Sequence, residues 1–317
     1  MTKKKSSHDR LMDQLNVICD KSNKDIFKIF KENSIDTSTY DNEYKPHTIL
    51  KLSYLSYYMG IFLPIARKHF NKVVFIDAFS GSGLVKINGS AHTVLGSSLL
   101  AATAQVTRNN VYTFDQIISI DKDKSKVDLL DKRFKALQKT NANAIYGDAN
   151  EIIKQIPRMF NLDKNTIILL FIDPEGMEPI LSEFINLFRQ VKAVDTITNY
   201  TWGVYRLHGR IIKNMNETDI TTMQHMIPDY VAGENPDEKL YKFFEETIGK
   251  PIGDKIDIHD IGKKVSYSLI LRINDTKSHG EWLSDIEKFG KYLSTLDDAK
   301  SLLFLNQVFN EQRHLDV

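Results

Sequence analysis

The sequence predicts an α/β fold in which a doubly wound, mainly parallel sheet carries helices on both faces. Five short runs of β-branched and aromatic residues show no polar alternation, which is typical of strands buried on both faces. Helical stretches separate these runs, and strands that alternate with helices need crossover connections and therefore a parallel sheet. The expected strands cover residues 73–76, 116–120, 142–146, 166–172 and 193–198.

The expected helices precede and separate these strands. Residues 47–69 carry apolar side chains at spacings of three and four, which predicts a long helix with one wide apolar face. Pro64 should kink or divide it, because proline lacks the backbone N–H that the helix needs. The helices between strands are expected over residues 97–107, 124–139, 150–159 and 181–191.

The flanking regions complete the predicted organisation. Residues 1–44 read as a polar tail with a helical extension broken near Ser22, and residues 45–204 as the core. Residues 205–262 are expected to be a helical insertion, whose clearest helix covers 238–248. Residues 263–317 should complete the core with a strand and two helices, although 302–309 could instead form a final strand.

Composition excludes several classes of protein. The 317 residues are 42% hydrophobic and carry a formal net charge of +1, so a global basic field cannot attract nucleic acid or anionic lipid. Cys19 is the only cysteine, and the histidines show no metal-ligand spacing, so we expect neither a disulfide nor a metal site. The longest apolar runs, such as 167–172, are far shorter than a membrane helix of about 20 residues. We therefore expect a cytoplasmic protein that does not span a membrane.

Aspartates follow four consecutive predicted strands. They are Asp77, Asp121, Asp148 and Asp173, and Asn199 follows the fifth strand. One such aspartate could be a helix cap or a turn former. An ionised carboxylate must be solvated or paired, however, and ligands of open α/β sheets bind at the carboxyl ends of the strands. The series therefore predicts a ligand site.

The glycine spacing narrows the choice of ligand. Lys86 stands where a dinucleotide fingerprint has its third glycine, and no phosphate-binding P-loop occurs. S-adenosylmethionine fits better, because Gly81 and Gly83 let the backbone approach its amino acid portion. Asp77 could then orient the ammonium group, and Asp121 could accept hydrogen bonds from the ribose. Asp148 could bind the adenine amino group.

These residues also resemble known motifs. Residues 77–83, Asp-Ala-Phe-Ser-Gly-Ser-Gly, are similar to the first motif of the Rossmann-like S-adenosylmethionine-dependent methyltransferases, and the next three motifs follow in order. Over residues 45–200 the chain resembles the three-Cys-motif partner proteins, a methyltransferase-like group named for its association with a protein that bears three cysteines. The shared residues are His47-Thr48, Lys51-Leu52, 75–83, Gly96-Ser97 and 171–176. The resemblance implies that S-adenosylmethionine binds at Asp77, Phe79, Gly81, Gly83, Asp121 and Asp148.

The methyl acceptor is less defined. Asp173-Pro174 matches the start of the loop that amino-group methyltransferases of nucleic acid use, but Glu175 and Gly176 replace the second proline and the aromatic residue of that loop. The three-Cys-motif partner proteins usually have a proline where Ser98 stands and an aromatic residue where Glu175 stands. Methylation at a base nitrogen therefore stays open, whereas methylation at carbon 5 of cytosine lacks its thiol. Glu175 could be a general base or a turn residue.

Several further residues have two interpretations each. Asn199 and Tyr200 could hold the acceptor and Trp202 could wall the pocket, or they could form a polar turn that closes the core. His47 and Lys51 share a helix face, and we favour a helix cap and a solvated side chain over a role in the pocket.

Two functions follow from these observations. A methyltransferase would need an acceptor, and a basic face formed by Arg206, Arg210 and Lys213 would be either a nucleic-acid contact or a solvated helix face. The alternative is a module that keeps the fold without catalysis and binds another protein, for which the insertion could serve.

Overall fold

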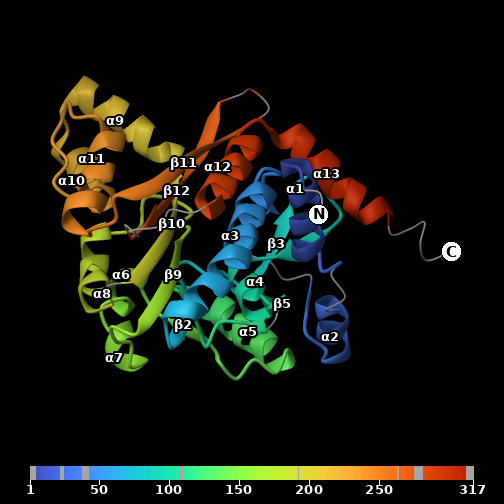
Figure 1. Ribbon diagram of the computed structural model, residues 1–317. Coiled ribbons are helices and arrows are strands. Elements are labelled where there is room, and N and C mark those ends of the chain that lie inside the picture. The colour runs from blue at the N-terminus through green and yellow to red at the C-terminus, as the bar shows by residue number, and fades with distance from the viewer. Residues whose placement is uncertain are drawn as a thin grey trace.

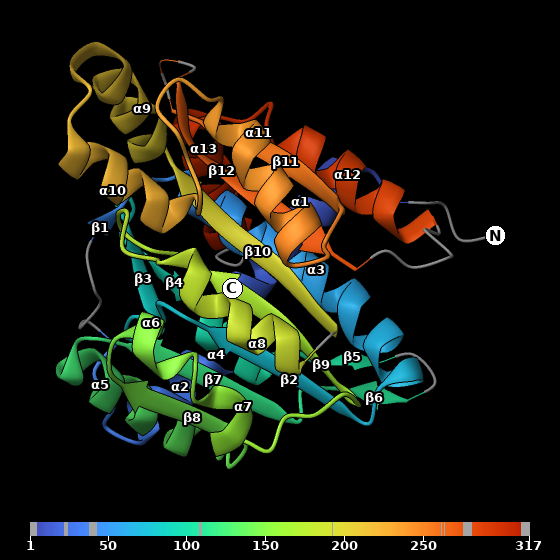
Figure 2. The same ribbon diagram turned by 90° about the vertical axis from the view of Figure 1, so that its left-hand side faces the viewer.

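A seven-stranded sheet crosses the centre of the molecule (Figure 2). The computed structural model describes residues 5–21, 25–37, 43–107, 110–191, 193–260, 262, 264–274 and 281–311. From one edge to the other the strands are β11 Ile252–His259, β12 Val265–Ile273, β10 Ala193–Thr201, β9 Thr166–Ile172, β2 Lys72–Asp77, β7 Gln116–Asp121 and β8 Ala142–Tyr146.

The strand order is that of a Rossmann-like fold with one inserted strand. β8, β7, β2, β9 and β10 are parallel neighbours, which in chain order of the parallel strands reads 3-2-1-4-5. β12 lies between β10 and β11 and is antiparallel to both. This arrangement confirms the predicted doubly wound, mainly parallel sheet, and the five predicted parallel strands are all present.

Alternate residues of each central strand pack on opposite faces of the sheet. In β2, Val73 and Phe75 join the core on one face, whereas Val74 and Ile76 join the core on the other. The first face is covered by α1 Ser7–Ile18, α2 Ile26–Glu32, α3 Thr48–His69, α4 Ser97–Thr103, α5 Lys124–Ala136, α12 Glu281–Leu293 and α13 Asp298–Glu311. The second face is covered by α6 Ala149–Ile152, α7 Ile156–Met159, η1 Leu181–Phe184, α8 Ile185–Gln190, α9 Trp202–Asn214, α10 Glu217–Met226, α11 Pro236–Lys242 and the π-helix Phe243–Thr247.

Figure 1 shows α9, α10 and α11 as a lobe at the upper left, separated by the sheet from α1 and α13. These three helices come from the region in which the sequence predicts a helical insertion. Helical structure is present there up to Thr247.

α3 runs through the core. Among the described residues it is the one helix long and apolar enough to cross a membrane, and 72% of its most apolar window is buried inside the protein. Such burial is typical of a core helix in a globular protein. Pro64 lies inside α3 and does not divide it.

Two expectations about secondary structure are wrong, and one alternative is excluded in favour of the expected helix. β11 was not anticipated, because Asp254, Lys255 and Asp257 make its sequence look like a polar loop; charged side chains are common on edge strands. Residues 302–309 are part of α13 and not a strand. The helix expected over 150–159 is split into α6 and α7, with a proline in the first turn of α7.

The remaining small sheets were also not foreseen, and the first helix of the expected N-terminal extension begins earlier than predicted. β3 Leu84–Ile87 pairs with β4 Thr93–Leu95 and with β1 Glu43–Tyr44, and β5 Val106–Thr107 pairs with β6 Val111–Tyr112. α1 begins inside the expected tail, because the Ser6 side chain accepts a hydrogen bond from the Asp9 backbone and caps the helix. The predicted break near Ser22 lies outside the described residues.

Candidate cofactor and acceptor site

A cavity of about 790 Å³ opens at the carboxyl ends of the parallel strands. The structure brings nearly all of the predicted site residues together around it. Those that line the cavity are Phe79, Gly81, Gly83, Asp121, Asp148, Asp173, Pro174, Glu175 and Asn199. Asp77 is the one predicted site residue that does not.

The turn after β2 forms one wall of the cavity. Gly81 and Gly83 have φ angles of 57° and 88°, a region that favours glycine. A Cβ on Gly83 would lie 2.7 Å from Leu130 Cδ1, and the Gly83 carbonyl accepts a hydrogen bond from the Gly96 N–H at 2.7 Å. The turn can therefore pack against α4 and α5 only without a side chain at Gly83.

Asp77 lies beneath this wall and is fully buried. Its Oδ2 accepts hydrogen bonds from the hydroxyls of Ser97, at 2.5 Å, and Ser98, at 2.8 Å. Ser119 in turn donates to the Ser98 hydroxyl. Burial raises the pKa of Asp77 to about 7, against the opposing effect of the two serine hydrogen bonds. Ser97 lies on the cavity side, so contact between Asp77 and a cofactor stays a prediction.

Asp121 and Asp148 lie at the ends of the next two strands. The Asp121 carboxylate accepts hydrogen bonds from the backbone N–H groups of Gly81 and Asp123, both at 2.8 Å, which fixes it beside the glycine turn. Asp148 caps α6 by accepting from the Asn150 N–H at 2.8 Å. Both carboxylates are thus held at the cavity by backbone groups.

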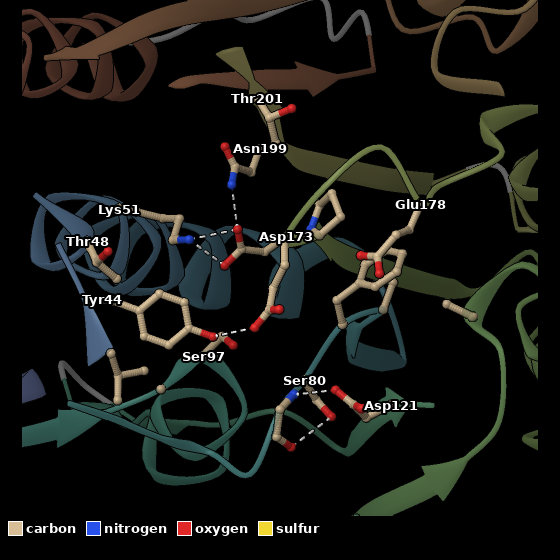
Figure 3. Close-up of a pocket in the computed structure, with 18 of the residues that line it drawn as sticks. Tyr44, Thr48, Lys51, Ser80, Ser97, Asp121, Asp173, Glu178, Asn199 and Thr201 are labelled. Atoms are coloured by element: carbon tan, nitrogen blue, oxygen red, sulfur yellow. Dashed lines mark hydrogen bonds and ion pairs between the residues drawn. The ribbon is translucent and has the colours of Figure 1, made fainter. Parts of the chain in front are cut away.

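Lys51, Asp173 and Asn199 form a polar cluster at the opposite side of the cavity (Figure 3). The Lys51 Nζ lies 2.7 Å and 2.6 Å from the two Asp173 carboxylate oxygens. The Asn199 Nδ2 donates to Asp173 Oδ1 at 2.7 Å. The favoured interpretation of Lys51 as a solvated side chain is therefore wrong, because Lys51 is buried and paired.

His47 occupies the N-cap position of α3, but its side chain makes no capping hydrogen bond. Its Nδ1 lies 2.7 Å from Asp298 Oδ1, and burial is the main reason that its pKa is lowered. The His47 carbonyl accepts a hydrogen bond from the Tyr267 hydroxyl at 3.0 Å. His47 thus links α3 to α13 and β12 at the edge of the cavity.

Glu175 follows Asp173-Pro174 and is exposed. Its Oε1 accepts a hydrogen bond from the Tyr44 hydroxyl at 2.9 Å. Tyr44, His225 and Tyr267 also line the cavity, although none of them is predicted as a site residue from the sequence. They come from β1, α10 and β12, and no local motif marks them, because their proximity depends on how distant segments pack.

The other expectations for this region have mixed outcomes. Tyr200 is fully buried in the core, which agrees with the structural interpretation, and the side chain of Trp202 lies outside the described part of the chain. Within the residues that the structure describes, no group of acidic, histidine or cysteine side chains could hold a metal ion.

The three predicted basic residues lie on α9. Arg206, Arg210 and Lys213 are exposed, and none of them lines the cavity. Arg210 donates to both carboxylate oxygens of Asp219, at 3.1 Å and 3.0 Å. Its charge is therefore already paired within the insertion.

No protein-family model and no curated protein matches this sequence. A solved Legionella pneumophila protein described by the DUF519 family model is 13% identical, with a TM-score of 0.45 over 76% of this chain and 91% of that chain. An O-methyltransferase from Bacillus cereus in complex with SAH is 11% identical, with a TM-score of 0.38 over 79% and 89%. The O-methyltransferase TomG from Streptomyces achromogenes, involved in tomaymycin synthesis and solved with SAM, is 10% identical, with a TM-score of 0.39 over 87% and 93%. Since these TM-scores lie below 0.5, the fold assignment rests on the strand order.

Proposed function

We propose that this chain is an S-adenosylmethionine-dependent methyltransferase. The observation that carries the proposal is that the glycine turn at 79–83 and three strand-end carboxylates, Asp121, Asp148 and Asp173, line one cavity of about 790 Å³. Cavities that bind cofactors and small molecules typically measure about 300 to 1,000 Å³.

The residues around the cavity fit this cofactor. Gly81 and Gly83 line the cavity without side chains, which leaves their backbone available for the amino acid portion of the cofactor. Asp121 is held where a carboxylate could accept both ribose hydroxyls, and Asp148 would accept the adenine amino group. Asp77 would act on the ammonium group through or beside Ser97.

The acceptor would bind at the side of Asp173 and Asn199. Bound S-adenosylmethionine supplies the electrophilic methyl group, so the chain has to align the acceptor and receive a proton. Asp173 and Asn199 would hold the acceptor, with Pro174 fixing the turn between Asp173 and Glu175. Glu175 would receive the proton, because its carboxylate lies at the cavity directly after Asp173-Pro174 and is exposed.

The finer assignment is to the three-Cys-motif partner proteins. In its support, His47, Thr48 and Lys51, which carry part of that resemblance, line the same cavity as the glycine turn. This proposal implies a cytoplasmic protein that associates with a partner bearing three cysteines. Co-purification of such a partner with the tagged chain would test it.

The second candidate is a partner module without catalysis. The observation in its favour is that Ile212 and Met215 at the end of α9 are 56% and 63% exposed. Apolar side chains in an exposed insertion can serve a protein partner.

Calorimetric titration with S-adenosylmethionine tests the cofactor. We expect binding by the wild type, weaker binding by Asp121→Ala, and wild-type binding by Asp128→Ala, whose carboxylate pairs with Lys124 on the outside of α5. A wild type that binds no S-adenosylmethionine would exclude the methyltransferase.

Transfer itself is tested by incubating the protein with radiolabelled S-adenosylmethionine and a cell extract. Nuclease and protease treatment then identify the chemical class of the labelled acceptor, nucleic acid being the first class to examine. Label that appears with the wild type but not with Asp173→Ala would discard the partner module. Cofactor binding without any labelled acceptor would favour it.

A further inference from the structure

Three rings from distant parts of the chain line the cavity beside Asp173 and Asn199. They belong to Tyr44 of β1, His225 of α10 and Tyr267 of β12. Figure 3 shows the ring of Tyr44 on the same side of the cavity as Lys51 and Asp173. The Tyr44 hydroxyl donates a hydrogen bond to Glu175. We call the part of the cavity around these rings and this cluster the acceptor lobe.

The ring of Tyr44 is held at both ends. Its backbone pairs with Ile87 in β3, and its carbonyl accepts a hydrogen bond from the Asn88 N–H at 2.8 Å. Its hydroxyl donates to Glu175 at 2.9 Å. A ring fixed in this way loses little freedom when a ligand packs on it, so it is a preorganised contact surface.

Tyr267 is fixed as well. Its hydroxyl donates to the His47 carbonyl, its side chain is buried, and the Lys51 ammonium lies 5.5 Å from the ring centre. The acceptor lobe therefore has two aromatic rings in fixed positions. One comes from β1, which precedes α3 in the chain, and the other from β12, which follows it.

The charge and polarity of the acceptor lobe restrict the chemical class of its ligand. Lys51 pairs with Asp173, so this ion pair adds no net charge to the lobe, and the carboxylate of Glu175 beside Tyr44 disfavours an anionic ligand. Asn199, Thr201 and Ser266 also line the cavity and offer amide and hydroxyl groups. Fixed rings with a few polar groups suit a neutral, flat molecule whose edge forms hydrogen bonds.

We infer that Tyr44 determines acceptor specificity by stacking on a neutral planar heteroaromatic ring of the nucleobase type. The inference rests on the proposed function, because it names the substrate class of the same site. Such a ring could belong to a free nucleoside or to an unpaired base in a nucleic acid, since enzymes that act on bases stack them on aromatic side chains outside the helix.

The test is saturation-transfer NMR with the full chain, with and without saturating S-adenosylhomocysteine. The probes are adenosine, guanosine, cytidine, uridine, a single-stranded oligonucleotide of mixed sequence, and ribose as the non-aromatic control. With S-adenosylhomocysteine bound, we expect saturation transfer to the base protons of at least one nucleoside or of the oligonucleotide. We expect no saturation transfer to ribose. Binding of the oligonucleotide but not of the nucleosides would identify a nucleic acid as the source.

Two substitutions distinguish the contribution of the Tyr44 ring to binding from that of its hydroxyl. Tyr44→Leu removes the ring and should weaken binding of the probe roughly 5- to 150-fold, the loss of one stacking contact of about 1 to 3 kcal/mol. Tyr44→Phe keeps the ring and should weaken it far less. Tyr112→Leu, in β6 and outside the cavity, is the matched control, and circular dichroism checks that each variant is folded.

The outcomes are distinct. The inference is overturned if the wild type binds S-adenosylhomocysteine but no planar probe, if Tyr44→Leu binds probes as the wild type does, or if Tyr44→Phe loses as much as Tyr44→Leu. A labelled protein as sole acceptor would overturn it too. Base binding without any S-adenosylhomocysteine binding would support the stacking role and discard methyl transfer.

Discussion

The ion pair between Lys51 and Asp173 defines the acceptor side of the site at the scale of single residues. Both side chains are largely removed from water, and Asn199 adds a hydrogen bond to the same carboxylate. Removing one member of a buried pair leaves the other charge without compensation, which costs more than the pair itself contributes.

We therefore expect Lys51→Met to lower the free energy of unfolding by roughly 3 kcal/mol. Asp173→Asn in the same chain should restore part of this loss, because no unpaired charge then remains. Urea unfolding of both variants measures the effect. The control is Lys122→Met, because Lys122 pairs with Glu178 at the exposed rim and its loss should cost less than about 1 kcal/mol. Equal losses in Lys51→Met and Lys122→Met would contradict the prediction.

Asp77 predicts a dependence of stability on pH. Burial raises its pKa from 3.8 to about 7, so the folded state holds the proton more tightly than the unfolded state. Its contribution to stability is therefore complete below pH 4 and is lost as the pH rises through 7. In Asp77→Asn this loss is absent. Between pH 5.5 and 8.5 the wild type should lose roughly 2 kcal/mol relative to Asp77→Asn in urea unfolding. A constant difference between the two proteins at both pH values would refute the assignment.

The sequence predicts some site residues and misses others for a physical reason. Asp121, Asp148 and Asp173 follow parallel strands, and the carboxyl ends of such strands meet at one edge, so their meeting is predictable. Lys51 looked solvated because a lysine on an amphipathic helix usually is. Tyr44 and Tyr267 reach the cavity through β1 and β12, and their pairing with other strands is not visible in their local sequence.

At the scale of elements, the glycine turn between β2 and β3 is sterically constrained. Gly83 combines a φ of 88° with a packing distance that excludes a Cβ. Gly83→Ala should lower the free energy of unfolding by roughly 2 to 4 kcal/mol, through backbone strain and overpacking against Leu130. It should also weaken binding of S-adenosylmethionine, because the turn must shift.

Gly209→Ala is the matched control for this turn. Gly209 lies on the exposed face of α9, and a Cβ there meets nothing within 4 Å. Alanine favours a helix over glycine, so this variant should gain roughly 0.5 to 1 kcal/mol in thermal or urea unfolding. A Gly83→Ala variant as stable as the wild type would show that the turn is not constrained. A Gly209→Ala variant destabilised as much as Gly83→Ala would show that the loss of stability is not specific to the turn.

Strands could be predicted from the sequence where helices cover both faces of the sheet. The central strands β2 and β9 are nearly continuous apolar runs because helices cover both faces, and such runs stand out from the helices between them. β11 lies at the edge of the sheet, where charged residues are tolerated. Its charged residues make its sequence resemble a polar loop. The position of α12 against β11 followed only from the structure.

At the scale of the whole molecule, a net charge of +1 means that nucleic acid could be held only by a local patch. The best-placed candidates in the sequence, Arg206, Arg210 and Lys213, lie on the helix that directly follows β10 and the acceptor side of the cavity. Because Asp219 already pairs with Arg210, we expect Arg206 and Lys213 to make most of any phosphate contacts.

If the acceptor is a nucleic acid, replacing all three residues by alanine should weaken its binding across sequences and flatten the salt dependence. Each lost phosphate contact removes about 0.7 to 0.9 from the magnitude of the slope of log K against log salt. The decrease in slope should therefore correspond to about two phosphate contacts instead of three. Fluorescence anisotropy with a single-stranded oligonucleotide at several salt concentrations measures the slope. Lys132 and Lys135 in the last turns of α5 and Lys139 just after it lie toward the amino ends of the strands, and their triple alanine variant should keep the slope. Affinity for S-adenosylmethionine should stay constant in both variants. An unchanged slope in the α9 variant would remove this helix from the interface, and a wild type that binds no nucleic acid at low salt would leave free nucleosides or proteins as the acceptors to test.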